Sequence, residues 1–489
     1  MTANELFLVH GAQFLRQYQG NLRWFCRAVD EGHVPPADDE TIRPHVQLLK
    51  RHMGLAAASE DDEFLLRFGL IVPGLMRGIV PPVSILEPER GGFSDKRLEQ
   101  AAGQVRRLQE ALRMARRFFG ELGPGPVASL RQLSQRLTEV MGRDSAWIEM
   151  HARLPEEEFA TLASRALACL DEPGESAELG PGILGCLANF RCEGLGRQTA
   201  ELLKRDFFWP SSLYRDAPDE VAEGLIQRIE GSKASDRLRL NHLLLSLAWT
   251  RGETARSAFL HWRNSPPAWA GALHVPPEEY LPHAGWALDS KGDRRELISL
   301  SCYPVAPVAA GGFRPQFPVH CRTEIEAPCP ACRSPLAWLF DFANLPGEYF
   351  SGDREAAPRR VLCCLHCSCF CPAVFSRYEL DGTAKLHPAT KSDETEAIGE
   401  RPAVVRALVP NARPAFAAAE PFQISDATSL GGCPMWLQDA QYPRCPECQE
   451  VMIFLAQFDN LAMKPAEEGI YYSFFCPRCR VAAVNYQQT

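Results

Sequence analysis

Apolar residues recur at three- and four-residue steps through residues 1–302, which is the spacing of a single helical face. The first such run covers residues 8–29 and stops at Asp30-Glu31-Gly32. A second run covers residues 98–119 and ends at Gly120. Both patterns predict amphipathic helices that bury one face.

Further helices are expected at short intervals after Leu154. Pro155 suits a first helical turn before the apolar face of residues 159–170, and residues 217–230 repeat the pattern. Residues 238–249 are apolar on nearly every side, which predicts a central, buried helix. Consecutive helices with short turns favour stacked hairpins of the helical-repeat kind, although the segment has no fixed repeat period.

The last third of the chain alternates apolar and polar positions in the manner of β-strands. A cysteine pair opens this pattern twice, as Cys329-Pro-Ala-Cys332 and, 116 positions later, as Cys445-Pro-Glu-Cys448. The match continues beyond the cysteines, with Asn344-Leu345 aligned to Asn460-Leu461. We therefore predict a tandem duplication of a β-rich unit.

Segments rich in proline mark the boundaries between these regions. Residues 303–318 separate the helical part from the cysteine-rich part, and residues 387–420 connect the two β-rich units as an ordered excursion or a loose linker. The expected fold is a multidomain α+β protein with four parts. These are a helical domain over 1–130, a helical, repeat-like domain over 131–302, and zinc-ribbon-like units over 319–388 and 421–489.

The cysteine pairs have the spacing of tetrahedral zinc sites. Two residues between cysteines let one tight turn present two sulfurs to one ion, and two such turns complete a four-thiolate shell. The second unit supplies one complete set, Cys445, Cys448, Cys476 and Cys479. A shell of four cysteines leaves no position for water, so the sequence predicts two structural Zn²⁺ ions, one in each unit.

The ligands of the first unit are less uniquely defined. Cys329 and Cys332 form one pair, and the returning segment offers a choice among Cys363, Cys364, His366, Cys367, Cys369 and Cys371. Among the cysteines of this segment only Cys364 and Cys367 keep the two-residue gap, so we assign these two as ligands. The surplus thiols are interpreted as packing residues, with alternative ligation or redox chemistry left open.

Tryptophan is concentrated between the helical and cysteine-rich parts. Trp249, Trp262, Trp269 and Trp286 lie among proline pairs in residues 249–286. Packing of the last helices is the favoured interpretation. The alternative is a partner-binding surface, since tryptophan provides a large contact area at low entropic cost.

Charge and composition narrow the functional classes. With 61 acidic against 52 basic residues the net charge is −9, which makes a nucleic-acid partner less favoured. The arginines of residues 106–117 could line a nucleic-acid stripe, but Glu99 and Glu110 interrupt them and favour a solvated face. The N-terminus has no signal pattern, and prolines and arginines interrupt the longest apolar stretch. A cytoplasmic protein without a membrane span is expected, where clustered cysteines indicate metal binding rather than disulfides.

One C-terminal element resembles a known family. The segment Gly431-Gly432-Cys433-Pro434-Met435-Trp436-Leu437-Gln438 and the later Phe454-Leu455-Ala456-Gln457 resemble the YwqG-like family of uncharacterised bacterial proteins. The resemblance is strong over about the last sixty residues and weak over about the last 190. It implies no agreed activity, but some members look like components of toxin and immunity gene clusters. Trp436 therefore joins Trp262, Trp269 and Trp286 as a candidate partner-binding residue.

Catalytic motifs give no clear signal. Gly180-Pro-Gly-Ile-Leu-Gly185 has the letters of a dinucleotide loop, but no strand precedes it and a proline interrupts it. A site assembled from distant residues stays open. The sequence favours a non-catalytic zinc protein that binds another protein, such as a toxin that it neutralises. The alternatives are a nucleic-acid-binding zinc ribbon and an enzyme with an unrecognised site.

Overall fold

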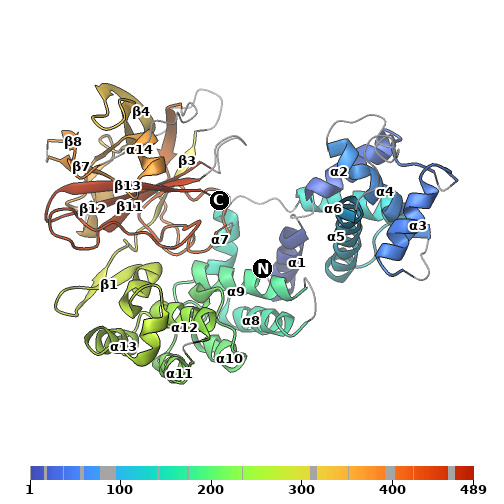
Figure 1. The fold of residues 1–489 in the computed structure, drawn as a ribbon, viewed down its shortest axis with the longest axis horizontal. Helices are drawn as coiled ribbons and strands as arrows, with labels where there is room; N and C mark the ends of the chain where they lie inside the picture. Colours follow the sequence, from blue (N-terminus) through green and yellow to red (C-terminus); the bar gives the residue numbers. More distant parts are fainter. Residues whose placement is uncertain are drawn as a thin grey trace. The chain divides into compact units, whose positions relative to one another are not determined.

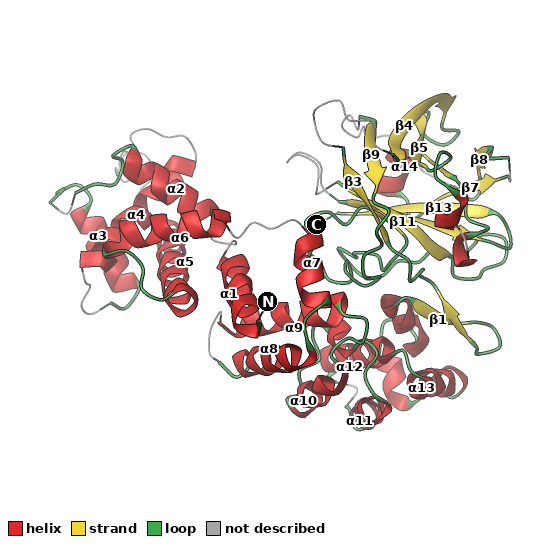
Figure 2. Cartoon of the chain, turned by 180° about the vertical axis from the view of Figure 1, so that it is seen from behind, coloured by secondary structure: helices red, strands yellow, loops and turns green. Residues whose placement is uncertain are grey.

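The structure is a computed structural model of residues 1–489 (Figures 1 and 2). It describes residues 2–15, 19–36, 38–55, 60–76, 95–139, 144–172, 176–233, 235–308, 316–350, 352–379, 381–390, 402–421, 423–460 and 469–488. The chain divides into two compact units, of which unit 1 comprises residues 1–143 and 155–183, and unit 2 comprises residues 144–154 and 184–489. The division thus falls later in the chain than the expected boundary after residue 130.

Unit 1 is built from helices that pack their apolar faces together. They are α1 (Ala3–Phe14), α2 (Gln19–Asp30), α3 (Arg43–His52), α4 (Glu60–Met76), α5 (Asp95–Phe119), α6 (Gly125–Glu139) and α8 (Glu156–Cys169), and α9 (Ser176–Phe190) crosses into unit 2. The predicted ends are present, since α2 and α5 stop just before Gly32 and Gly120, whose φ angles of 68° and 74° suit glycine.

The single helical face expected over residues 8–29 is instead shared by two helices. Helix α1 packs mainly on α5 and α8 and more weakly on α6, whereas α2 packs mainly on α6 and α4 and more weakly on α5. The break between the two helices gives each its own main neighbours. Tyr18, one of the residues of the expected face, lies outside the described residues.

The helical part of unit 2 packs around one helix that is buried over its C-terminal half, while Leu238 near its start is 68% exposed. Its helices are α7 (Asp144–Ala152), α10 (Thr199–Lys204), α11 (Asp219–Glu230), α12 (Arg237–Thr250) and α13 (Glu253–Asn264), with 3-10 turns η4 (Gly196–Gln198), η5 (Ser211–Tyr214), η6 (Ala268–Ala272) and η7 (Pro277–Ala284). Helix α12, predicted as the central one, contacts α11, α13, η5 and η7 and buries residues 246–250 completely or nearly so. No helix in the described part of the chain is long and apolar enough to cross a membrane.

The rest of unit 2 is dominated by one large sheet. Its strands are β3 (Tyr303–Pro307), β4 (Pro318–Pro328), β5 (Pro335–Asp341), β6 (Arg360–Cys363), β7 (Val374–Tyr378), β8 (Ala384–Leu386), β9 (Val404–Leu408), β10 (Ser429–Leu430), β11 (Ile453–Asp459), β12 (Ile470–Cys476) and β13 (Val481–Gln487). The eleven strands follow the order β6-β5-β4-β9-β3-β10-β11-β12-β13-β7-β8. The outermost strands β6 and β8 contact each other, so the sheet nearly closes on itself. A separate hairpin is formed by β1 (Trp286–Leu288) and β2 (Arg294–Glu296).

Two expected connecting segments contribute strands to this sheet. Strand β3 lies in the expected boundary 303–318, and β9 lies in the expected connection 387–420, where it pairs with β3 and β4. Residues 309–315 and 391–401 of these segments lie outside the described residues. The prolines of these segments favour loops, but pairing with distant strands places β3 and β9 in the sheet.

The β-rich units at 319–388 and 421–489 share the sheet rather than forming separate domains. Strand β7, from the first unit, pairs with β13, the last strand of the second. A common core lies under both, where Phe340 stacks on Phe342 at 5.0 Å and meets Phe458 edge-on at 6.2 Å. The tandem duplication itself stays a prediction.

Phe416 joins the helical part of unit 2 to the sheet part. The buried guanidinium groups of Arg215 and Arg251 lie 4.7 and 5.2 Å from the centre of its ring, and Trp249 meets the ring edge-on at 5.8 Å. Cation–π contacts gain strength where water is excluded. This joint holds the two parts of unit 2 together.

Candidate metal centres

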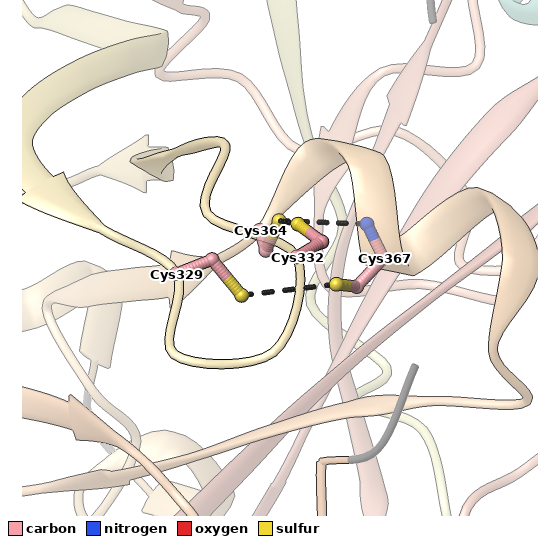
Figure 3. A group of neighbouring side chains, drawn as sticks. All are labelled: Cys329, Cys332, Cys364 and Cys367. Atoms are coloured by element: carbon pink, nitrogen blue, oxygen red, sulfur yellow. Dashed lines mark hydrogen bonds between the residues drawn. The ribbon is translucent and has the colours of Figure 1, made fainter. Parts of the chain in front are cut away.

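Four cysteines, two from a hairpin turn and two from the start of a short helix, meet in cluster 1, which we define as Cys329, Cys332, Cys364 and Cys367 (Figure 3). The Sγ atoms of Cys329 and Cys367 lie 3.7 Å apart, and those of Cys332 and Cys364 lie 3.5 Å apart. All four sulfurs lie within 4.8 Å of one another, and three of the four residues are buried. The cluster thus contains the pair that the two-residue spacing selected.

The turn between β4 and β5 presents the first two sulfurs. The amide of Cys329 donates to the carbonyl of Ser334 at 2.8 Å, and the amide of Arg333 donates back to the carbonyl of Cys329 at 2.9 Å. Arg333 has φ = 68°, the left-handed conformation that closes such a turn. Two cysteines on one tight turn therefore face the same point.

A short helix presents the other two sulfurs of cluster 1. Cys364 follows β6 and caps α14 (Leu365–Phe370), where its Sγ accepts a hydrogen bond from the amide of Cys367 at 3.4 Å. The amide of Ser368 donates to the carbonyl of Cys364 at 3.0 Å. The helical turn thus holds Cys364 and Cys367 on one side, as three-residue spacing on a helix requires.

Cluster 2 is the second set, Cys445, Cys448, Cys476 and Cys479. The Sγ atoms of Cys448 and Cys476 lie 3.7 Å apart. Both of its turns repeat the hydrogen bond seen at Cys329, because Gln449 donates to the carbonyl of Cys445 at 2.8 Å and Arg480 to that of Cys476 at 3.0 Å. Gln449 and Arg480 have φ angles of 62° and 53°.

The sulfur separations match a tetrahedral metal shell. A Zn–S bond of about 2.3 Å places tetrahedral sulfurs roughly 3.8 Å apart, close to the observed 3.5–3.7 Å. A disulfide would need about 2.05 Å, and all 18 cysteines are free thiols. Both clusters therefore have distances that could hold a metal ion.

Ionisation of the thiols is uneven in each cluster. Burial opposes the charged form, but hydrogen bonds from Ser334 and from neighbouring thiols lower the pKa of Cys332 to about 6. At Cys448 burial is likewise outweighed, by the backbone of Glu450 and neighbouring thiols, and the pKa falls to about 7. Burial and the adjacent thiols raise the pKa of Cys476 to about 12. In cluster 2 the charged form is thus favoured at Cys448 and opposed at Cys476, and a bound dication would stabilise the thiolate at both positions.

The surplus candidates of the first unit lie outside cluster 1. Cys363 ends β6 in the buried core, where burial raises the pKa of its thiol well above the usual value. Cys369 lies 3.3 Å from the carbonyl of Leu365 and 3.7 Å from the hydroxyl of Tyr471. His366 packs against Phe370, and Cys371 follows the helix. These positions favour packing roles.

The four candidate tryptophans do not form a surface. Trp262, Trp269, Trp286 and Trp436 are 2%, 7%, 0% and 8% exposed. Trp262 packs edge-on against Trp269 at 5.2 Å, and Trp436 lies on Tyr472 at 4.6 Å. The rings fill the interior of unit 2, which agrees with the favoured interpretation that they pack the core and gives the alternative, a partner-binding surface, no support.

The Gly-Gly element is a tightly packed turn. Gly431 and Gly432 have φ angles of 76° and 83°, and a Cβ atom on Gly431 would lie 2.2 Å from the carbonyl oxygen of Ser301. Only glycine fits there.

Buried amide side chains hold the loop after this turn, a role that the sequence analysis missed. The Oε1 atom of Gln457 accepts from the amide of Met435 at 2.8 Å, and its Nε2 donates to the carbonyl of Ala427 at 2.7 Å. Gln487 accepts from the amide of Leu437 at 3.1 Å. The sequence feature that could indicate this role of Gln457 and Gln487 is a glutamine within a mostly apolar strand.

Comparison with known proteins adds one relative. No protein-family model matches the chain, and no solved structure matches it. The uncharacterised protein YpfL of Salmonella typhimurium is 30% identical over 352 residues, which cover 70% of this chain and 80% of the relative. The chain therefore belongs to the same family as YpfL.

Proposed function

We propose that this protein binds two structural zinc ions, one in cluster 1 and one in cluster 2, and that the ions hold the large sheet in its folded form. The sulfur separations of 3.5–3.7 Å in both clusters are the observation that carries the proposal. Each ion would join two chain segments that are far apart in sequence. Reduced thiols are required, which fits a cytoplasmic location.

The metal ions have no catalytic role in this proposal. A zinc ion with four thiolate ligands has no open position for water or substrate, unlike catalytic zinc sites with three protein ligands. Each cluster offers four sulfurs, and the surplus candidates of the first unit lie outside it. The zinc ions therefore stabilise the fold. In this proposal the protein functions by binding a partner through surface residues outside the two clusters.

Elemental analysis of the purified full chain tests the proposal. We expect two zinc ions per chain, and one in the variant Cys445→Ser/Cys448→Ser. The control Cys192→Ser replaces an exposed cysteine outside both clusters and should keep two. Tetrahedral thiolate sites also suit iron, so iron in place of zinc would contradict the choice of metal. Unchanged zinc in the double variant would contradict the assignment of cluster 2.

A second candidate function is the binding of another protein, supported by one exposed aromatic surface. Trp209 is 55% exposed and stacks on His242 at 5.1 Å, and Leu238, four residues before His242 on α12, is 68% exposed. Exposed tryptophan is frequent among the residues that dominate binding energy. We define Trp209, Leu238 and His242 as the Trp209 surface.

A basic side chain next to Leu238 in the sequence supports an acidic partner. Arg237 is exposed, and its Nη1 lies 2.9 Å from Nε2 of His274. We propose that the partner is a protein with an acidic segment, which would include a toxin of the kind implied by the YwqG-like resemblance. The carboxylates of the cluster 2 turns, Glu447 and Glu450, disfavour nucleic acid there.

Site-directed photocrosslinking in the host cell tests this surface. A photoreactive residue at Leu238 should crosslink to one protein through an acidic peptide, and Arg237→Glu should abolish the adduct. The matched control is Leu300, which is 64% exposed and does not belong to α12. Equal adducts at both positions, or a crosslink to a second copy of this chain, would contradict the proposal.

A further inference from the structure

Strand β7 connects the two cysteine clusters. It begins seven residues after Cys367 and runs antiparallel to β13, which begins two residues after Cys479. The register pairs Val374 with Val484 at one end and Arg377 with Val481 at the other. The chain that leaves cluster 1 therefore ends beside cluster 2.

Both turns of cluster 2 are contacted from the chain that follows cluster 1. The amide of Tyr378 donates to the carbonyl of Arg480 at 3.0 Å, directly after Cys479. Glu447, between Cys445 and Cys448, forms an ion pair with Arg377, and His387 Nε2 lies 3.5 Å from the same carboxylate. The position of each turn thus depends on β7.

A second connection runs through α14, which carries Cys367. The helix packs against β13, and the Sγ atom of Cys369 lies 3.7 Å from the hydroxyl of Tyr471. Tyr471 belongs to β12, whose last residue is the cluster 2 ligand Cys476. Displacement of α14 would therefore disturb β12 as well as β13.

We propose that clusters 1 and 2 bind their metal ions cooperatively, with β7 and α14 as the elements that couple them. The inference rests on the proposed zinc binding. Loss of the ion from cluster 1 frees the turn that positions α14 and β7, and β7 then no longer holds the turns of cluster 2. Packed elements with two discrete arrangements are the physical basis of such coupling.

The coupling must be reciprocal. Binding at one site changes affinity at a second site typically by about 5- to 150-fold, and the two effects are equal by thermodynamic necessity. We expect Cys445→Ser/Cys448→Ser to weaken zinc binding at cluster 1 about tenfold or more. Cys329→Ser/Cys332→Ser should weaken binding at cluster 2 by the same factor.

Chelator titration of the unmodified full chain, followed by native mass spectrometry, tests the proposal without any substitution. Two equal, independent sites would leave roughly half of the molecules with one zinc ion at the midpoint. Coupled sites pass from two ions to none with a much smaller one-zinc fraction. A one-zinc fraction of half or more, together with equal zinc affinity of cluster 1 in the unmodified chain and in Cys445→Ser/Cys448→Ser, would overturn the coupling and leave the zinc sites standing. A folded chain that binds no zinc would instead overturn the proposed function.

A surface variant tests the route through β7. Arg377→Ala removes the ion pair with Glu447 and should raise the one-zinc fraction while the chain still binds two ions. The matched control is Arg153→Ala, which removes an exposed ion pair with Glu149 at 2.8 Å in the helical part of unit 2. The control should titrate like the unmodified chain. An equal rise of the one-zinc fraction in both variants would show that β7 does not couple the two clusters.

Discussion

The Sγ atoms of Cys332 and Cys364 lie 3.5 Å apart, although 32 positions separate the two residues in the chain. Strands β5 and β6 lie between them and pair with each other. The hairpin therefore delivers two pairs of sulfurs to one point, and a metal ion there would lock the register of its strands.

Removal of zinc should loosen the sheet and spare unit 1. Structural zinc contributes on the order of 10 kcal/mol in small zinc domains, so its loss exposes the strands that it joins. Hydrogen exchange after chelation should show lost protection in β5, β6, β11 and β12. Helix α5 of unit 1 is the internal control and should keep its protection. Equal loss in α5 would show general unfolding instead.

Substitution at Gly431 should destabilise the Gly-Gly turn. Gly431→Ala forces a side chain into a left-handed conformation at a cost of about 1–3 kcal/mol and drives its Cβ into the carbonyl of Ser301. The control Gly271→Ala places its Cβ in open space. Thermal melting should show a lower Tm for the first variant only, and an unchanged Tm for Gly431→Ala would refute the packing of this turn.

Gln457 should be required for stability rather than chemistry. Gln457→Leu leaves the buried amide of Met435 without its acceptor, at a cost of about 1–3 kcal/mol. It also removes one of two hydrogen bonds to the carbonyl of Ala427, which keeps the bond from Arg413 at 3.1 Å. We expect a lower urea midpoint with two zinc ions still bound. Gln441→Leu, at an exposed position, serves as the control. Loss of zinc in Gln457→Leu would show that the residue acts on cluster 2.

Mild acid should destabilise unit 2 through His151. Burial lowers the pKa of this histidine to about 4, and its Nδ1 lies 2.7 Å from the carbonyl of Trp147. In the unfolded chain the pKa returns to about 6.5, so the unfolded state binds the extra proton first. The free energy of unfolding is therefore highest above pH 6.5, and it falls by roughly 3 kcal/mol as the pH decreases toward 4.

The variant His151→Phe isolates this contribution from the release of zinc in acid. Its stability should fall less between pH 7 and pH 5 than that of the unmodified chain, since zinc loss affects both equally. The exposed His261→Gln should behave like the unmodified chain. Identical pH slopes for all three proteins would argue against a buried, neutral His151.

Local features of the fold could be predicted from the sequence. The ends of α2 and α5 follow from Gly32 and Gly120, and a gap of two residues selects Cys364 and Cys367 from six candidates. Each of these depends on neighbours in the chain. The same holds for the tight turn at Cys445.

Long-range pairing could not be predicted in this way. Nothing near β7 indicates that it pairs with β13, and the prolines around β9 suggest a loop. Trp286 is of a residue type that is common at contact surfaces. It is nevertheless fully buried, and its Nε1 donates to the carbonyl of Ala248 at 2.9 Å. Such outcomes depend on which distant surfaces meet, and periodicity carries no information about that.

Native mass spectrometry of the full chain, purified from its own host under reducing conditions, tests the central claim most directly. We predict a folded chain that carries two zinc ions, and one zinc ion after Cys445→Ser/Cys448→Ser. A folded chain without metal, or one with disulfides within the clusters, would contradict the account.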